Sequence, residues 1–172
     1  VIRWIALGLL LAVLTGLGSL AFGYPFLTSH TAHLTLPVLG DAAAAPVGPA
    51  QWRGRARIVN LWASWCGTCR EEHPALMSLA ATLRAQGRAD QLVGLNYKDR
   101  AADAGDWLAR LGDPFSMSLV DADGRMAIEL GVYGAPETFV IDAQGVILHR
   151  HVGALTPEII ARELLPRLGS GS

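Results

Sequence analysis

Two cysteines, Cys66 and Cys69, are the residues whose type and spacing most directly indicate chemistry in this sequence. They are the only cysteines in the 172 residues, and they enclose Gly67-Thr68 at the start of a stretch with helical character. Two thiols three residues apart at the beginning of a helix face the same side and can close into a disulfide. Backbone N–H groups and the helix dipole favour a thiolate at the first position, and the thiolate is the nucleophile in disulfide exchange. This placement indicates a redox catalyst.

The same two cysteines allow other interpretations. One is a purely structural disulfide, although closing so short a loop constrains the unfolded chain little. Another is a metal site, because Cys66, Cys69 and His73 have ligand-like spacing, although the sequence offers no convincing fourth ligand for structural zinc. Covalent haem attachment is excluded, because the C-x-x-C-H motif requires a histidine where Arg70 stands.

Strand and helix patterns alternate around the two cysteines from residue 56 onward. Residues 56–62 form a nearly continuous apolar run, as expected of a strand that is buried on both faces. Thr156 and Pro157 are typical of an N-cap and a first helical position, which predicts a final helix. The segments together predict an α/β sandwich, with strands at 56–62, 91–97, 117–120, 137–142 and 146–151 and helices at 67–86, 101–111, 125–130 and from residue 156 onward.

The amino-terminal part of the sequence has the character of a membrane segment. No charged residue occurs from Trp4 through Phe22, and an apolar run of about 18 or more residues can cross a bilayer as a helix. Because Arg3 precedes this run and no Lys or Arg follows until Arg53, the positive-inside rule places the rest of the chain outside the cytoplasm. A cleaved signal peptide, processed near Ser19-Leu20-Ala21, is the alternative. The net charge of −1 gives no argument for nucleic-acid binding.

Several stretches of the sequence resemble one family of proteins. The C-x-x-C motif lies within residues 60–74, and the loop Val132-Tyr-Gly-Ala-Pro-Glu-Thr-Phe precedes a later strand. Together with residues 94–99 and 107–115, these stretches make residues 56–155 resemble the CcmG/DsbE thiol:disulfide interchange proteins of bacterial cytochrome c maturation. The resemblance implies a thioredoxin-like sandwich, a central mixed sheet flanked by helices. This family commonly has proline between its cysteines, whereas this chain has Gly67-Thr68, and that dipeptide tunes the redox potential.

The resemblance and the apolar run together predict three parts of the chain. A transmembrane anchor is expected over residues 1–28, a connector over 29–55 and a thioredoxin-like domain over 56–169. Within the connector, Leu34 to Leu39 alternates like a short strand, and Pro37 favours an edge position for it. The residues that follow, rich in alanine, proline and glycine, indicate a loop.

The resemblance also implies roles for particular residues. Cys66, at the helix start, is expected to be the attacking thiol, and Cys69, one turn inward, the resolving thiol. The Ala135–Pro136 bond is expected to be cis, which would place backbone groups of Ala135 beside the thiols, where an extended substrate chain could pair with them. Trp65 is expected to cover one side of the disulfide and to offer a flat contact for a partner peptide, with ordinary packing at the helix start as the alternative. The residues expected to bind substrate or tune the thiols are Trp65, Gly67, Thr68, Glu72, Ala135, Pro136 and Glu137.

Two glutamates are candidates for proton transfer. Cys66, Cys69 and Glu72 are spaced i, i+3, i+6 along one helical stripe, and Glu137 follows the proline expected to be cis. Classical thioredoxins have a buried aspartate six residues before the first cysteine, where this chain has Asn60, which cannot titrate. We therefore hypothesise that Glu72, Glu137 or both relay the proton of the second thiol. A solvated glutamate is the alternative, in particular for Glu72.

The remaining polar residues are interpreted more simply. His73 is expected to be a solvated or capping side chain, not a ligand. His149 and His151 alternate along a strand and share a face, which favours surface pairing over a metal site. Lys98 and Asp99 follow a strand end and are either loop charges or contacts for a partner. No metal is assigned.

The resemblance implies a membrane-anchored reductant on the periplasmic side of the bacterial inner membrane. Its expected substrates are the C-x-x-C-H thiols of apocytochrome c, or of a partner that carries them. The dithiol of Cys66 and Cys69 would need no other cofactor, and a transmembrane electron donor of the DsbD/CcdA type would reduce it again. The alternatives are a general periplasmic disulfide oxidant, a non-enzymatic apocytochrome or haem-binding chaperone, and a copper- or zinc-binding protein.

Overall fold

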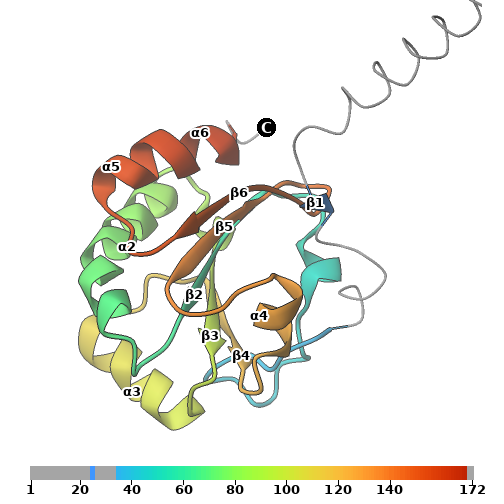
Figure 1. Ribbon diagram of the computed structural model, residues 1–172, viewed down its shortest axis with the longest axis vertical. Coiled ribbons are helices and arrows are strands. Elements are labelled where there is room, and N and C mark those ends of the chain that lie inside the picture. Colours follow the sequence, from blue (N-terminus) through green and yellow to red (C-terminus); the bar gives the residue numbers. More distant parts are fainter. Residues whose placement is uncertain (1–23, 26–33, 170–172) are drawn as a thin grey trace, which may run out of the picture.

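The computed structural model describes residues 24–25 and 34–169 (Figure 1). The predicted anchor, residues 1–28, lies outside them except for Tyr24 and Pro25, which form a short strand beside the last strand of the sheet. No helix in the described residues is long and apolar enough to cross a membrane. The strands are β1 (Tyr24–Pro25), β2 (Arg57–Trp62), β3 (Leu92–Tyr97), β4 (Met117–Asp121), β5 (Glu137–Ile141) and β6 (Val146–Val152), and the helices are α2 (Gly67–Ala85), α3 (Ala101–Leu111), α4 (Arg125–Glu129), α5 (Pro157–Ile159) and α6 (Leu165–Leu168).

The six strands form one mixed sheet in the order β1-β6-β5-β2-β3-β4, as Figure 1 shows. Strands β2, β3 and β4 are parallel, whereas β5 and β6 each run antiparallel to their neighbours. Glu137, the first residue of β5, pairs with Leu61 near the end of β2. The carboxyl end of β2 and the amino end of β5 therefore lie at the same end of the sheet, where α2 begins.

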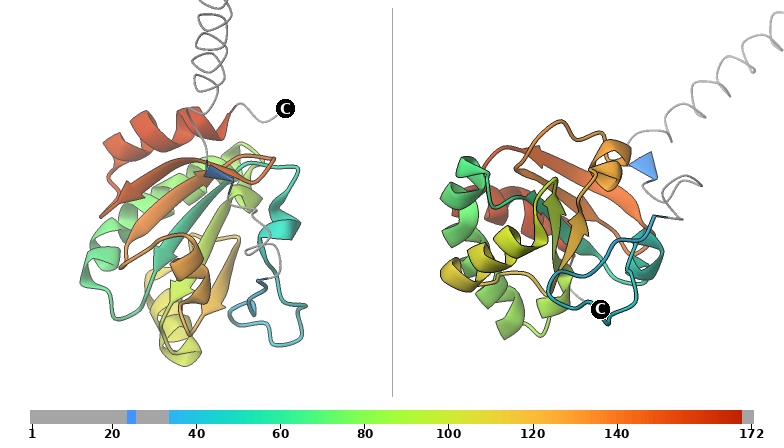
Figure 2. Two further views of the ribbon diagram at one scale, coloured as in Figure 1. Left: turned by 45° about the vertical axis from the view of Figure 1, so that its right-hand side comes forward. Right: turned by 90° about the horizontal axis from the view of Figure 1, so that it is seen from below.

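Helices flank the sheet, which confirms the predicted α/β sandwich. One face packs against α2, α3 and the C-terminal helical segment, and the other packs against α4 and the residues that precede β2 (Figure 2). Along β2, Ile58 and Trp62 belong to the first of these cores and Val59 and Leu61 to the second. All four side chains are buried, as the alternation of a strand covered on both faces requires.

Residues 34–52 belong to the folded core, which differs from the predicted connector. Leu36 and Trp52 are buried against the second face of the sheet. The expected edge strand is present only as isolated pairings, one of them with β4. Pro37 has no N–H to donate to a strand ladder, although its carbonyl accepts a hydrogen bond from the Val120 amide. The folded domain thus begins before residue 56.

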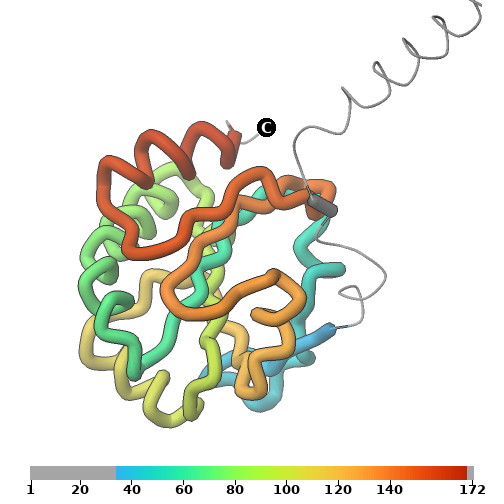
Figure 3. The backbone as a smooth tube through the Cα atoms, viewed as in Figure 1, coloured from blue at the N-terminus to red at the C-terminus, as the bar shows by residue number. Residues whose placement is uncertain are grey.

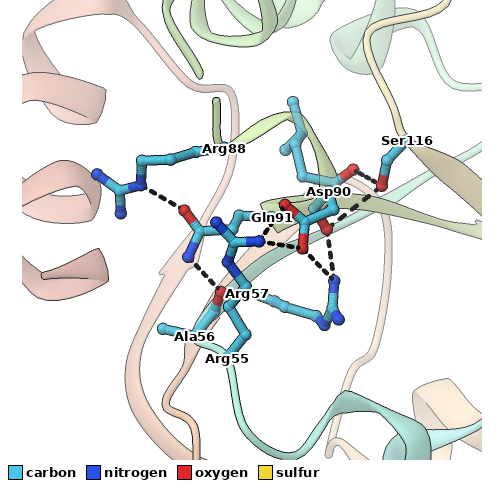
Figure 4. A network of polar contacts seen from close by, with 8 residues as sticks. Arg55, Ala56, Arg57, Arg88, Asp90, Gln91 and Ser116 are labelled. Atoms are coloured by element: carbon cyan, nitrogen blue, oxygen red, sulfur yellow. Dashed lines mark hydrogen bonds and ion pairs between the residues drawn. The ribbon is translucent and has the colours of Figure 1, made fainter. Parts of the chain in front are cut away.

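A polar network joins the amino ends of β2 and β3 (Figure 4). The Asp90 carboxylate pairs with Arg55 at 3.0 Å and with Arg57 at 3.8 Å. Beside it, the Gln91 side chain donates a hydrogen bond to the Ala56 carbonyl at 2.9 Å. Because the two cysteines follow the carboxyl end of β2, these contacts stabilise the end of the sheet that lies away from them.

The final helix begins as predicted but is not regular. Thr156 is its N-cap, and the Thr156 hydroxyl oxygen accepts a hydrogen bond from the Ile159 amide at 3.3 Å. A π-helical turn, Ile160–Leu164, separates α5 from α6. It precedes Pro166, whose ring has no N–H and would clash with the Arg162 carbonyl in an α-helix. This C-terminal segment runs alongside α2, as the chain trace in Figure 3 shows.

Candidate active site

Cys66 and Cys69 form a disulfide where β2 leads into α2. Cys66 is the N-cap of α2, with extended backbone angles, and its Sγ accepts a hydrogen bond from the Cys69 amide at 3.0 Å. A side chain in this position faces the free N–H groups of the first helical turn and the positive end of the helix dipole. Once the disulfide is reduced, the same groups stabilise a thiolate on Cys66.

The two sulfur-bearing residues differ in their access to solvent. Cys66 is 6% exposed and Cys69 is 2% exposed. Gly67 and Thr68, the dipeptide between them, are both exposed. An incoming disulfide therefore meets Cys66 first, whereas Cys69 is covered by the helix and the core. This order agrees with an attacking role for Cys66 and a resolving role for Cys69.

The loop that carries Trp65 into the helix is held by the residues after β3. The Asp99 carboxylate accepts hydrogen bonds from the Ser64 amide at 2.6 Å and from the Ser64 hydroxyl at 2.8 Å. The Trp65 indole N–H donates to the Lys98 carbonyl at 3.0 Å, and the indole is 57% exposed. The backbone of Lys98 has a φ of 45°, in the left-handed region, which residues other than glycine seldom adopt. Trp65 is thus held in place while much of its ring remains open to a partner.

The Ala135–Pro136 bond is cis, as expected. Because Glu137 pairs with Leu61, Pro136 lies level with the end of β2, directly before the segment that leads to Cys66. The Pro136 carbonyl accepts a hydrogen bond from the Gly153 amide at 3.1 Å. Ala135 is half-buried and packs against the core cluster that contains both cysteines. The structure therefore brings this loop and the disulfide to the same end of the sheet.

Glu72 lies one turn beyond Cys69 and is almost fully buried, which excludes the solvated alternative. Its Oε1 accepts a hydrogen bond from the Asn60 side-chain amide at 3.0 Å, and its Oε2 accepts one from the Leu155 amide at 2.8 Å. Asn60 also donates to the Thr138 hydroxyl at 3.0 Å. Burial raises the pKa of Glu72 to about 7, and the hydrogen bonds from Asn60 and Leu155 oppose that rise only in part. Its carboxyl can therefore bind or release a proton near neutral pH.

Glu137 is buried too, but its side chain faces away from Glu72. Thr138, its neighbour in β5, points toward Asn60 and the α2 side of the sheet. Successive strand residues point to opposite faces, so Glu137 points to the α4 side. There its carboxylate pairs with Arg150 at 2.6 Å, and Arg150 also donates to the Gly131 carbonyl at 3.0 Å. Glu137 thus anchors the loop before Pro136, whereas Glu72 is the carboxyl beneath the thiols.

The contacts of several residues at the site were not predicted from the sequence. Asn60 was recognised only as unable to titrate, whereas it hydrogen-bonds Glu72 directly. The sequence leaves Asp99 as either a loop charge or a contact for a partner, whereas in the structure it holds the loop before Cys66. His73 is buried against Trp107 and contacts the carbonyls of Leu111 and Gly112 at the end of α3, at 3.3 and 3.1 Å. It is therefore a capping side chain for a neighbouring helix and is not solvated.

The chain is similar to known proteins of one family. The Redoxin family model matches residues 23–165. The thiol:disulfide interchange protein DsbE of Yersinia pestis is 50% identical over 113 residues, which are 66% of this chain and 57% of that protein. The DsbE protein of Escherichia coli strain K12 is 46% identical over 114 residues, 66% of this chain and 58% of that protein. The chain thus spans less than two thirds of the length of these relatives.

A third relative is covered more fully, and solved structures agree in fold. DsbE of Pseudomonas aeruginosa is 43% identical over 131 residues, which are 76% of this chain and 69% of that protein. The crystal structure of a putative DsbE from Chlorobium tepidum superposes with a TM-score of 0.66 at 29% identity, covering 79% of this chain and 93% of that one. The structure of DsbF from MTB has a TM-score of 0.63 at 21% identity, covering 78% and 92%, and shares the fold.

Proposed function

Because the chain belongs to the Redoxin family and, within it, to the DsbE thiol:disulfide interchange proteins, we propose that it is a protein-disulfide oxidoreductase that works as a reductant. The observation that carries the proposal is the disulfide of Cys66 and Cys69 at the amino end of α2, beside the cis Pro136 loop. A structural disulfide would not require an N-cap sulfur facing helix amides, or an exposed indole next to it.

In the proposed reaction two electrons pass from the dithiol to a substrate disulfide. The Cys66 thiolate attacks one substrate sulfur, the substrate S–S bond breaks, and the second substrate sulfur leaves as a thiolate that takes up a proton. The Cys69 thiolate then attacks Cys66 in this mixed disulfide and releases the first substrate sulfur. The substrate ends as a dithiol and the protein as the Cys66–Cys69 disulfide, the form that the structure describes.

Glu72 is the proton acceptor that we propose for the second step. Cys69 must lose its proton before it can attack, and it is almost fully buried, so water has little access to it. Glu72 lies on the same helical stripe, and its pKa of about 7 suits proton exchange at neutral pH. Asn60 and the Leu155 amide hold both of its carboxyl oxygens in place. Glu137, paired with Arg150 on the opposite face, has no part in this transfer.

The family resemblance supports a proposal for the substrates, the location and the electron supply. We propose that the protein reduces the disulfide between the two C-x-x-C-H cysteines of apocytochrome c, or a disulfide of a maturation partner that carries these thiols. It would act in the periplasm, anchored to the inner membrane by residues 1–28, and would be reduced again by a donor of the DsbD/CcdA type. The exposed rings of Trp65 (57%) and Tyr133 (95%), on the loops before Cys66 and Pro136, support docking of a peptide chain.

The first test is the redox potential of the Cys66–Cys69 pair, measured on the full chain in thiol buffers. A reductant should lie between about −270 mV, as for thioredoxin, and about −200 mV. A potential near about −120 mV would make the protein an oxidant and would overturn the reductive role. The exposed Trp65, one residue before Cys66, offers a fluorescence signal for the titration.

A second test separates catalysis from chaperone-like binding. With an oxidised C-x-x-C-H peptide, Cys69→Ser should accumulate a mixed disulfide through Cys66, visible on a non-reducing gel. Cys66→Ser should accumulate none, because Cys69 lacks both exposure and the helix-end position. If a variant without both thiols supports cytochrome c maturation as the wild type does, the protein acts by binding and the redox proposal is wrong.

A further inference from the structure

Three metal-ligand side chains meet where β6 faces the C-terminal segment. They are His149 and His151 of β6 and Glu163 of the π-helical turn Ile160–Leu164. Their ligand atoms all lie within 4.8 Å of one another, a grouping that no other set of histidine, cysteine and acidic side chains makes in the described residues. The side chains are 21%, 17% and 24% exposed, so they are partly buried and still open to solvent.

The fold explains why these three residues converge. His149 and His151 are two residues apart in β6, so both point to the face that the C-terminal segment covers. Arg150, between them, points to the other face, where it pairs with Glu137. The π-helical turn places Glu163 over the two imidazoles, and π turns of this kind occur often at functional sites.

Two of the distances between these atoms match the edges of a metal tetrahedron. Zn²⁺ binds histidine nitrogen and carboxylate oxygen at about 2.0–2.2 Å, so neighbouring ligand atoms in a tetrahedral site lie about 3.3–3.5 Å apart. Here Nε2 of His149 lies 3.2 Å from Oε2 of Glu163, and Nδ1 of His151 lies 3.4 Å from the same oxygen. Both nitrogens therefore already stand at ligand-to-ligand distance from the carboxylate.

The Arg162 side chain determines which oxygen of Glu163 faces the two histidines. The Arg162 guanidinium donates a hydrogen bond to Oε1 of Glu163 at 2.9 Å. Oε2 is therefore the oxygen directed at the imidazoles of His149 and His151.

We propose that Nε2 of His149, Nδ1 of His151 and Oε2 of Glu163 bind a Zn²⁺ ion, with water as the fourth ligand. Two imidazoles and a carboxylate with an open fourth position are a donor set that zinc uses in proteins. The ion would join β6 to the C-terminal segment, so it would stabilise the folded chain. Neither cysteine contributes a ligand to the site.

The test is calorimetric titration of the metal-free, oxidised full chain with Zn²⁺ alone at neutral pH. The disulfide is kept closed so that the thiols cannot bind the metal. We expect one equivalent to bind and the melting temperature to rise with Zn²⁺ concentration, because a ligand that binds only the folded state stabilises it. Co²⁺ in place of Zn²⁺ should give the visible absorption of a tetrahedral site without a thiolate charge-transfer band.

Matched variants make the result specific to these residues. His149→Asn, His151→Asn and Glu163→Gln should each weaken binding at least about tenfold, which corresponds to about 1.4 kcal/mol. Glu129→Gln, which removes the same charge from an exposed position on α4, should bind as the wild type does. A Cys66→Ser/Cys69→Ser variant should also keep its affinity, which separates this site from the proposed redox function.

Two results would overturn the proposal. The first is the absence of saturable one-to-one binding by the wild type. The second is binding that persists unchanged in the His149→Asn/His151→Asn double variant, provided that circular dichroism shows the variant to be folded. Glu163→Gln guards against misfolding of the histidine variants, because glutamine keeps the size of the side chain and Glu163 is partly open to solvent.

Discussion

Replacing Glu72 by glutamine tests the buried carboxyl beneath the thiols most directly. Glutamine keeps the size of the side chain and removes only the ionisable group. The surrounding hydrogen bonds can adapt, because Oδ1 of Asn60 is buried and has no hydrogen-bond partner within the described part of the chain. If the side-chain amide of Asn60 flips, so that Oδ1 and Nδ2 exchange places, Oδ1 can accept hydrogen bonds from the introduced glutamine and from the Thr138 hydroxyl. We therefore expect Glu72→Gln to fold.

The expected size of the effect follows from the pKa of Glu72. Folding raises this pKa from 4.5 to about 7. At about 1.36 kcal/mol for each pKa unit, burying the ionised carboxyl costs the folded protein about 3 kcal/mol. Between pH 4.5 and 7 the folded state keeps a proton that the unfolded chain has lost, so the free energy of unfolding falls as the pH rises. Below this window the cost is absent, and above it the cost is complete.

The Glu72→Gln variant should lack this dependence. As the pH rises from 4.5 to 8, it should gain up to about 3 kcal/mol relative to the wild type, or about 6–12 °C in melting temperature for a chain of this size. The measurement is urea unfolding of the oxidised proteins across this range. Glu71→Gln, at the exposed neighbouring position, should follow the wild type. If wild type and Glu72→Gln instead give parallel curves across pH 7, Glu72 does not titrate there and cannot be the proton acceptor.

Two further predictions concern the frame around the site. Asp99→Asn replaces one acceptor oxygen by an amide group that faces hydrogen-bond donors, among them the Ser64 amide, so urea unfolding should show a free energy of unfolding about 2–3 kcal/mol lower. Thiol-exchange kinetics should show slower disulfide exchange, and an unchanged rate would mean that the loop before Cys66 needs no such support. Gly94→Ala would bring a Cβ against Oγ of Ser118 and within 2.7 Å of Nε1 of Trp62, so overpacking should lower the free energy of unfolding by about 1–3 kcal/mol. A melting temperature equal to that of the wild type would contradict this packing.

Local sequence patterns predicted most of the elements because each pattern is read within a few residues. The apolar run of β2 follows from its burial on two faces, and Thr156-Pro157 marks the start of the last helix by its own chemistry. The cis bond before Pro136 was different, since only the family resemblance indicated it. The prediction of a strand at residues 34–39 was wrong. Pro37 has no N–H to donate to a strand ladder, and only isolated pairings occur there.

The partners of the site residues were harder to predict because they come from distant parts of the chain. Spacing placed Glu72 on the stripe of the thiols, but its burial depends on the Leu155 amide, 83 residues away. Asp99 holds Ser64 across 35 residues, and no local pattern distinguishes it from a loop charge. The opposite orientations of Glu72 and Glu137 follow from sheet register, which the sequence alone left open.

The long separation between Glu72 and Leu155 has a consequence for the order in which the site is assembled. The chain leaves the ribosome amino terminus first, so both thiols and α2 exist before β5, β6 and the Leu155 amide have been made. Contacts that span so much sequence form late, because closing a long loop costs entropy. During that interval the thiols lack the cis-proline loop, and Glu72 is still a solvated carboxyl. A nascent chain can therefore have the helix-end environment of Cys66, but it lacks the buried proton acceptor for Cys69 until the segment after β6 has folded against α2.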